Sequence, residues 1–96
     1  LPIVLLEELA GQTRALEEAA DLADLVAMGK AAHKLKGSAA TLGAIRLGRL
    51  VETIENAARA NQPDIATSAM IEFRWLAQAS HEAMMQIRNE GFGGAD

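Results

Sequence analysis

Residues 31–44 read AAHKLKGSAATLGA, and this stretch indicates the fold most clearly. Its apolar positions recur every three or four residues, as they do when one face of an α-helix is buried. The same period covers residues 22–42, where the apolar stripe is Leu25, Met28, Ala32, Leu35, Ala39 and Leu42. Gly43 follows where a helix C-cap favours glycine. The stretch therefore predicts a core helix that ends at Leu42.

Three other segments also have a helical period: residues 2–20, 45–60 and 64–89. Asp21 is expected to cap the second helix, and Pro63 suits the start of the last one. The stripe expected to be buried on the last helix is Ile65, Ala69, Phe73, Leu76, Ser80, Ala83 or Met84, and Ile87. Short connections force consecutive helices to be antiparallel. The predicted fold class is therefore all-α, an antiparallel up-down-up-down four-helix bundle, and the capping residues argue against a long two-helix coiled coil.

Composition limits the chain to one domain and excludes several functions. We expect the bundle to occupy residues 1–90 and the glycine-rich residues 91–96 to form a flexible C-terminal tail. A net charge of −4 without a dense Lys/Arg run argues against binding to nucleic acid or membranes. The absence of cysteine excludes disulfides, thiolate metal sites and cysteine nucleophiles. The apolar start is too short for a signal peptide or a membrane span, so a cytoplasmic location is expected.

His33 lies roughly 130° from the centre of the apolar stripe, so it should face solvent. Its neighbours three and four residues away are Gly29, Lys30, Lys36 and Gly37. Each glycine costs about 0.5–1 kcal/mol in a helix interior, which indicates that a bulky group needs the space. A neutral imidazole is a competent nucleophile, and Lys36 would stabilise an anion attached to it. We interpret His33 as a candidate phosphoryl acceptor.

A plainer interpretation stays open at this point. His33 would then be an ordinary surface histidine, and the two glycines would only allow close helix packing. The sequence also leaves open which ring nitrogen of His33 carries the proton, and what sets that choice. Glu52 and Glu55 are expected to belong to a solvated helix face. Arg46 and Arg49 are either partner contacts or simply solubilising.

The string from His33 to Ala44 resembles the H-x-L-K-G-S-[SA]-x-x-L-G-A signature of histidine-containing phosphotransfer (HPt) domains of bacterial phosphorelays. In that family, a four-helix bundle presents one histidine that receives a phosphoryl group from one receiver-domain aspartate and passes it to another. The resemblance implies that His33 is the phospho-acceptor, that Lys36 stabilises the phosphate, and that Gly37 gives the receiver access. It also implies a module without kinase activity of its own.

The resemblance implies response-regulator receiver domains as partners, with Mg²⁺ bound by the receiver and no cofactor or metal bound here. Whether the domain stands alone or belongs to a hybrid sensor histidine kinase in the same chain stays open. If the helices pair about a turn at Asp21, residues near Ala10 lie at the height of His33. Candidate receiver contacts are therefore Ala10, Gly29, Lys30 and Lys34. The alternative function is a non-catalytic helical interaction or dimerisation bundle in which the histidine is incidental.

Overall fold

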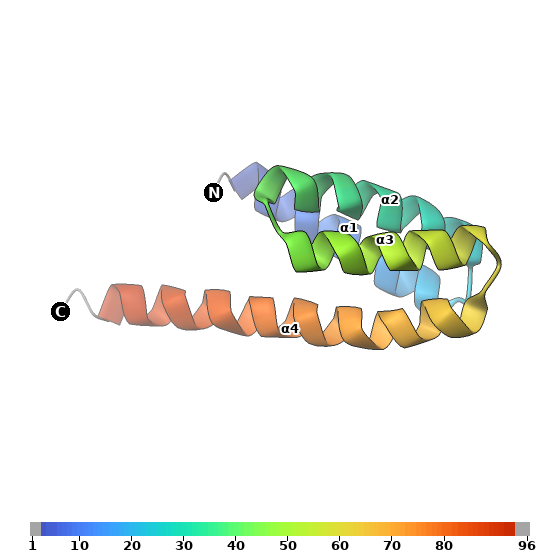
Figure 1. The fold of residues 1–96 in the computed structure, drawn as a ribbon. Coiled ribbons are helices and arrows are strands. Elements are labelled where there is room, and N and C mark those ends of the chain that lie inside the picture. The colour runs from blue at the N-terminus through green and yellow to red at the C-terminus, as the bar shows by residue number, and fades with distance from the viewer. Residues whose placement is uncertain (1–2, 94–96) are drawn as a thin grey trace.

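The computed structural model describes the backbone of residues 3–93 and the side chains of residues 3–79. Its four helices are α1 (Ile3–Asp21), α2 (Leu25–Leu42), α3 (Ile45–Arg59) and α4 (Pro63–Gly93). Successive helices run in opposite directions, and the described part contains no strand (Figure 1). This arrangement confirms the predicted all-α, up-down-up-down bundle.

Two of the three connections follow the predicted signals. Gly43 has a left-handed backbone with φ of 70°, and its N–H and that of Ala44 bond back to the last turn of α2. A side chain other than glycine would be strained there, so Gly43 ends the helix. Before α4, Asn61 turns the chain with φ of 56°, and Pro63 is the first helical residue.

The connection between α1 and α2 differs from the prediction. Asp24, not Asp21, is the N-cap of α2, and its carboxylate accepts a hydrogen bond of 3.1 Å from the Ala27 N–H. Asp21 is the last residue of α1 and forms an ion pair with Arg74 of α4 at 3.0 Å. The predicted cap was wrong because α1 continues through Asp21, and both aspartates are plausible caps by residue type.

The core lies where the apolar stripes of the four helices meet. Its largest fully buried side chains include Leu16 on α1, Leu35 on α2, Ile54 on α3 and Phe73 on α4. Burying these side chains removes apolar surface from water and so stabilises the bundle. The stripe of α4 differs from the prediction at its start, because Ile65 is 48% exposed and Met70 is buried instead. Of that predicted stripe, the residues from Ser80 onward lie outside the described side chains.

Helix α4 is much longer than its neighbours and extends past the other three at the end where α2 joins α3 (Figure 1). It runs to Gly93, so it overlaps the start of the tail predicted for residues 91–96; residues 94–96 lie outside the described part. Helix α2 packs on both α1 and α3, and α3 packs on α4, whereas α1 and α4 make few contacts. No helix among the described residues is long and apolar enough to cross a membrane.

Candidate functional site

His33 lies on the outer surface of α2, on the side that faces α3. Its side chain is 61% exposed, as its position on the helix predicts. The ring is nevertheless fixed, because Nδ1 lies 2.9 Å from Oε2 of Glu55 on α3. One edge of the imidazole is therefore held by the protein, while the rest of the side chain is largely open to solvent.

Glu55 is the centre of this site. Its side chain is only 2% exposed, and its two carboxylate oxygens contact three side chains. Lys36 Nζ lies 2.7 Å from Oε1, and Arg59 Nη2 lies 2.8 Å from Oε2, the oxygen that also contacts His33. One buried carboxylate therefore joins two side chains of α2 to one of α3.

The prediction that Glu55 belongs to a solvated face was wrong. Val51 and Ala58, one turn before and one turn after it on the same side of α3, are both buried in the core. Glu55 therefore lies at the edge of the core stripe and points toward α2. Glu52, one turn away on the outer face, is exposed as expected. The apolar residues at i−4 and i+3 were the signal in the sequence that identifies Glu55.

These contacts also determine the charge of Glu55. The hydrogen bond from Lys36 is the largest influence, and it lowers the pKa of the carboxyl below its ordinary value of 4.5. Burial acts in the opposite direction, while the contacts with His33 and Arg59 lower the pKa further. The net effect is a lowered pKa, so Glu55 is ionised at neutral pH.

An ionised carboxylate decides which nitrogen of His33 carries the proton. A carboxylate only accepts hydrogen bonds, so Nδ1 must be the N–H donor to Glu55. In the neutral ring the other nitrogen, Nε2, then has a free lone pair. Nε2 is therefore the ring nitrogen of His33 that can act as a nucleophile.

The two glycines near His33 have different surroundings. A Cβ built at Gly37, one turn after His33, would meet nothing within 4 Å, so the surface there is open. Gly29, one turn before His33, is buried, and its Cβ would lie 3.7 Å from Ala58 Cβ and from Arg59 Cγ. Gly29 was predicted to leave space for a bound group, but it faces α3 instead. It is a packing position beside Arg59.

The remaining candidate contacts do not all surround His33. Lys30 and Lys34 are exposed on α2. Ser38 Oγ donates a 2.7 Å hydrogen bond to Gln12 Oε1, which places the middle of α1 beside Ser38 rather than beside His33. Ala10 accordingly lines a groove of about 760 Å³ with Leu42 and other residues near the turn between α2 and α3. Ala10 was predicted to lie beside His33, and this was wrong. The register of α1 against α2 differs from the register expected for a turn at Asp21.

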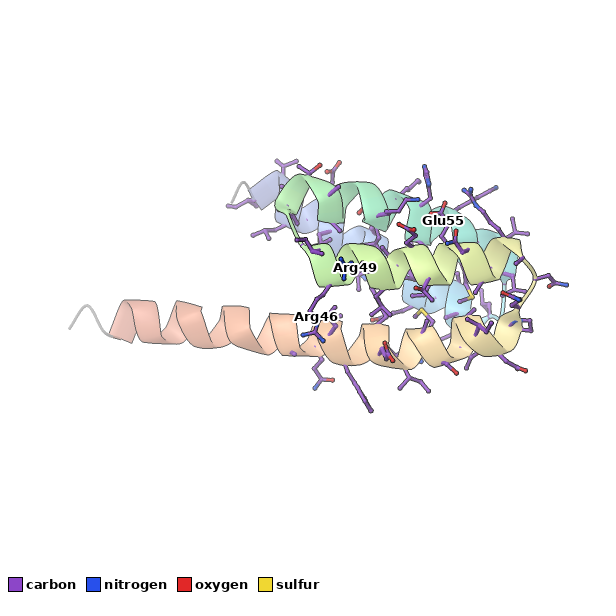
Figure 2. All side chains as sticks on the ribbon, viewed as in Figure 1. Arg46, Arg49 and Glu55 are labelled. Atoms are coloured by element: carbon purple, nitrogen blue, oxygen red, sulfur yellow. The ribbon has the colours of Figure 1, made fainter. Side chains whose placement is uncertain are left out.

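Arg46 and Arg49 lie away from this site. They come from the first half of α3, on the side toward α4, whereas Glu55 lies in the second half, on the side toward α2 (Figure 2). Both arginines line a hollow of about 670 Å³ together with the exposed Trp75. They therefore do not belong to the immediate surroundings of His33.

No metal-binding cluster accompanies the histidine in the part of the chain that the structure describes, where three or more His, Cys, Asp or Glu side chains nowhere come together. The cations at the site are side chains, Lys36 and Arg59. Their arrangement beside an exposed imidazole suits an anionic group more than a metal ion.

Comparison with known proteins identifies one family. The family model of the Hpt domain matches residues 3–90, which include α1, α2, α3 and most of α4. No curated protein and no solved structure matches the chain.

Proposed function

Because the chain belongs to the Hpt domain family, whose members carry phosphoryl groups, we propose that His33 accepts a phosphoryl group from a receiver-domain aspartate and passes it to the aspartate of another receiver. The observation that supports this most strongly is the exposed imidazole whose Nδ1 is held by the buried Glu55 carboxylate. That contact leaves Nε2 free to attack.

The proposed step is a direct displacement at phosphorus. The Nε2 lone pair forms the N–P bond while the P–O bond to the aspartate breaks, and the aspartate leaves as a carboxylate. No proton has to leave Nε2, because Nδ1 carries the ring proton. The phosphorylated ring is positively charged, and the Glu55 carboxylate at 2.9 Å from Nδ1 stabilises that charge. Transfer to the second receiver reverses these steps.

The other residues would act on the phosphoryl group and on access to it. Lys36 is 37% exposed and is one turn from His33, so its ammonium would stabilise the phosphoryl oxygens. Gly37 would allow the receiver surface to approach the ring, since nothing lies within 4 Å of its missing Cβ. Lys30 and Lys34 are exposed on α2 near the ring, where a docked receiver would lie. Phosphoryl transfer depends mainly on such positioning and charge stabilisation.

The metal ion needed for transfer would belong to the receiver domain. The receiver would hold the Mg²⁺ needed for transfer, and this domain would need no cofactor and no kinase activity of its own. The expected location, the cytoplasm, and the expected partners, response-regulator receiver domains, belong to the same proposal.

The test is transfer from phosphorylated receivers. The protein is incubated with a panel of phosphorylated receiver domains and Mg²⁺, and acid-labile, base-stable label on the chain is followed. We expect label on the wild type and none on His33→Gln. His81→Gln is the matched control, because His81 is the other of the two histidines, and it should be labelled normally. A folded wild type that no receiver labels would favour the alternative, a non-catalytic interaction bundle.

A further inference from the structure

Arg59 is the third side chain on the Glu55 carboxylate, and neither the sequence motif nor the family match assigns it a role. It is the last residue of α3. Its Nη2 lies 2.8 Å from Glu55 Oε2, and His33 Nδ1 lies 2.9 Å from the same oxygen. Because both nitrogens contact one oxygen, the guanidinium must lie beside the imidazole.

The aliphatic part of the Arg59 side chain, its stem, is packed against α2, in addition to the contact that its guanidinium makes with Glu55. A Cβ at Gly29 would lie 3.7 Å from Arg59 Cγ, so the stem of the arginine packs beside Gly29. Gly29 is one turn before His33 on α2. The Arg59 stem therefore lies against α2 one turn before His33.

The guanidinium keeps donors for a second acceptor. Arginine has five N–H donors in a planar fork, and Arg59 is 63% exposed while it contacts Glu55. Planar guanidinium groups bind phosphate oxygens with two parallel hydrogen bonds. A phosphoryl group attached to His33 would lie within reach of these free donors.

We propose that Arg59 binds the phosphoryl group on His33 together with Lys36 and so prolongs the lifetime of the phosphorylated state. This inference rests on the proposed function, because it needs His33 to be the phosphorylated residue. The cation stabilises the full negative charge of the attached phosphoryl group. Its removal should therefore speed the loss of that group to water.

The experiment uses a small donor, so that it does not depend on a particular receiver. The intact chain is phosphorylated with phosphoramidate, in which the His33 Nε2 lone pair forms the N–P bond and ammonia leaves. After the donor is removed, the loss of phosphohistidine is followed by ³¹P NMR. We expect Arg59→Gln to lose its phosphoryl group about threefold to tenfold faster than the wild type.

Two further variants separate direct contact from general effects. Arg49→Gln removes another exposed positive charge from the same helix and should decay like the wild type. Arg59→Lys keeps the charge at this exposed position but lacks the planar fork of donors, and its decay should be slower than that of Arg59→Gln. The ³¹P titration provides a readout that a merely structural role would not change, because loss of a contacting cation raises the pKa of the phosphoryl group.

The possible outcomes are distinguishable. If the wild type is phosphorylated on His33 and Arg59→Gln decays at the wild-type rate with an unchanged ³¹P titration, the inference about Arg59 is overturned and the proposed function stands. If neither phosphoramidate nor any phosphorylated receiver labels His33 in the folded wild type, both are overturned. Arg59 is largely exposed, so the variant that decides the question should fold.

Discussion

The two ends of α3 carry cations that are held in different ways. Toward its C-terminal end, three side chains converge on the carboxylate of Glu55, which is 2% exposed. Toward its N-terminal end, Arg46 and Arg49 line a hollow beside Trp75, and neither forms an ion pair with any residue of the described part (Figure 2). The same residue types on one helix thus form a defined site at one end only.

The difference lies in where the carboxylate is placed. The Glu55 side chain is almost fully buried at the edge of the core, so its charge has to be stabilised by direct contact with cations. Its partners are exposed enough to keep donors toward solvent. A carboxylate on an exposed helix face interacts with nearby cations by no more than about 1 kcal/mol. A charged group at the core boundary, and not the number of cations, therefore makes the site.

The largest expected effect comes from removing the charge of Glu55. Glu55→Gln keeps the shape of the side chain but weakens the hydrogen bond to Nδ1. The neutral amide also no longer stabilises the positive charge of the phosphorylated ring. We expect His33 to be phosphorylated by phosphoramidate about tenfold more slowly, corresponding to about 1.4 kcal/mol. Glu52→Gln is the matched control on the exposed face of α3. Equal rates for the two variants would contradict the role given to Glu55.

The second effect is on stability and its pH dependence. The pKa of Glu55 is lower in the folded chain than its ordinary value of 4.5, so the folded state favours the ionised form. Its stabilisation is complete above that value and is lost as pH falls through the folded pKa. We expect Glu55→Gln to lower the free energy of unfolding by about 1–2 kcal/mol near pH 7, and by progressively less below pH 4.5.

Denaturant titrations of the wild type and Glu55→Gln at several pH values measure this difference directly. The comparison removes the contribution of the other carboxylates, because these are common to both proteins. If the difference in free energy of unfolding between the two proteins stays constant or increases on acidification, the folded state does not favour the ionised form of Glu55.

A smaller effect concerns the open surface next to the ring. The Cβ in Gly37→Ala would meet nothing within 4 Å, so the change should stabilise α2 by up to about 1 kcal/mol. Labelling by phosphoramidate should be unchanged, while transfer from a receiver should become slower because the receiver must approach this surface. Gly43→Ala is a useful contrast, since its φ of 70° makes the same substitution destabilising. Unchanged receiver transfer in Gly37→Ala would remove Gly37 from the site.

The smallest effect is expected from adding a carboxylate at the other end of α3. Thr53 lies one turn after Arg49 and lines the same hollow. In Thr53→Glu, the new carboxylate can pair with Arg49 only on an exposed surface, so thermal unfolding should show a gain below about 0.5 kcal/mol. A gain comparable to the loss in Glu55→Gln would mean that burial of the carboxylate is unimportant.

The sequence predicted the bundle well because its main signals are local. The stripe from Leu25 to Leu42 has an unbroken helical period, and Gly43 ends it where the structure has a left-handed residue. The first cap was misplaced because Asp21 and Asp24 are both suitable caps, and only the packing of α1 determines where that helix ends. The buried face of α4 was rotated at its start for a similar reason, since Ile65 and Ala66 are both apolar neighbours and only Ala66 faces the core.

The site was predicted only in part. His33, Lys36 and Gly37 lie on one helix, so the spacing of α2 alone brings them together. Glu55 and Arg59 come from α3. The apolar residues at i−4 and i+3 indicate that Glu55 lies at the edge of the core stripe, but its contacts with side chains of α2 depend on how α3 is rotated against α2, which no local pattern reports. The role of Gly29 was misjudged for the same reason, because the residue that its missing side chain accommodates belongs to α3. Contacts between helices, not chemistry within one helix, separate the observed site from the predicted one.

The most direct test of the account is the proton position on His33 in the unphosphorylated protein. Long-range ¹H–¹⁵N NMR distinguishes the two neutral tautomers of an imidazole, and His33→Gln assigns the signals against those of His81. We expect the proton on Nδ1 in the wild type, donated to Glu55, and a weaker preference in Glu55→Gln. A wild-type ring with its proton on Nε2 would contradict the account, because the nitrogen proposed to attack phosphorus would then have no free lone pair.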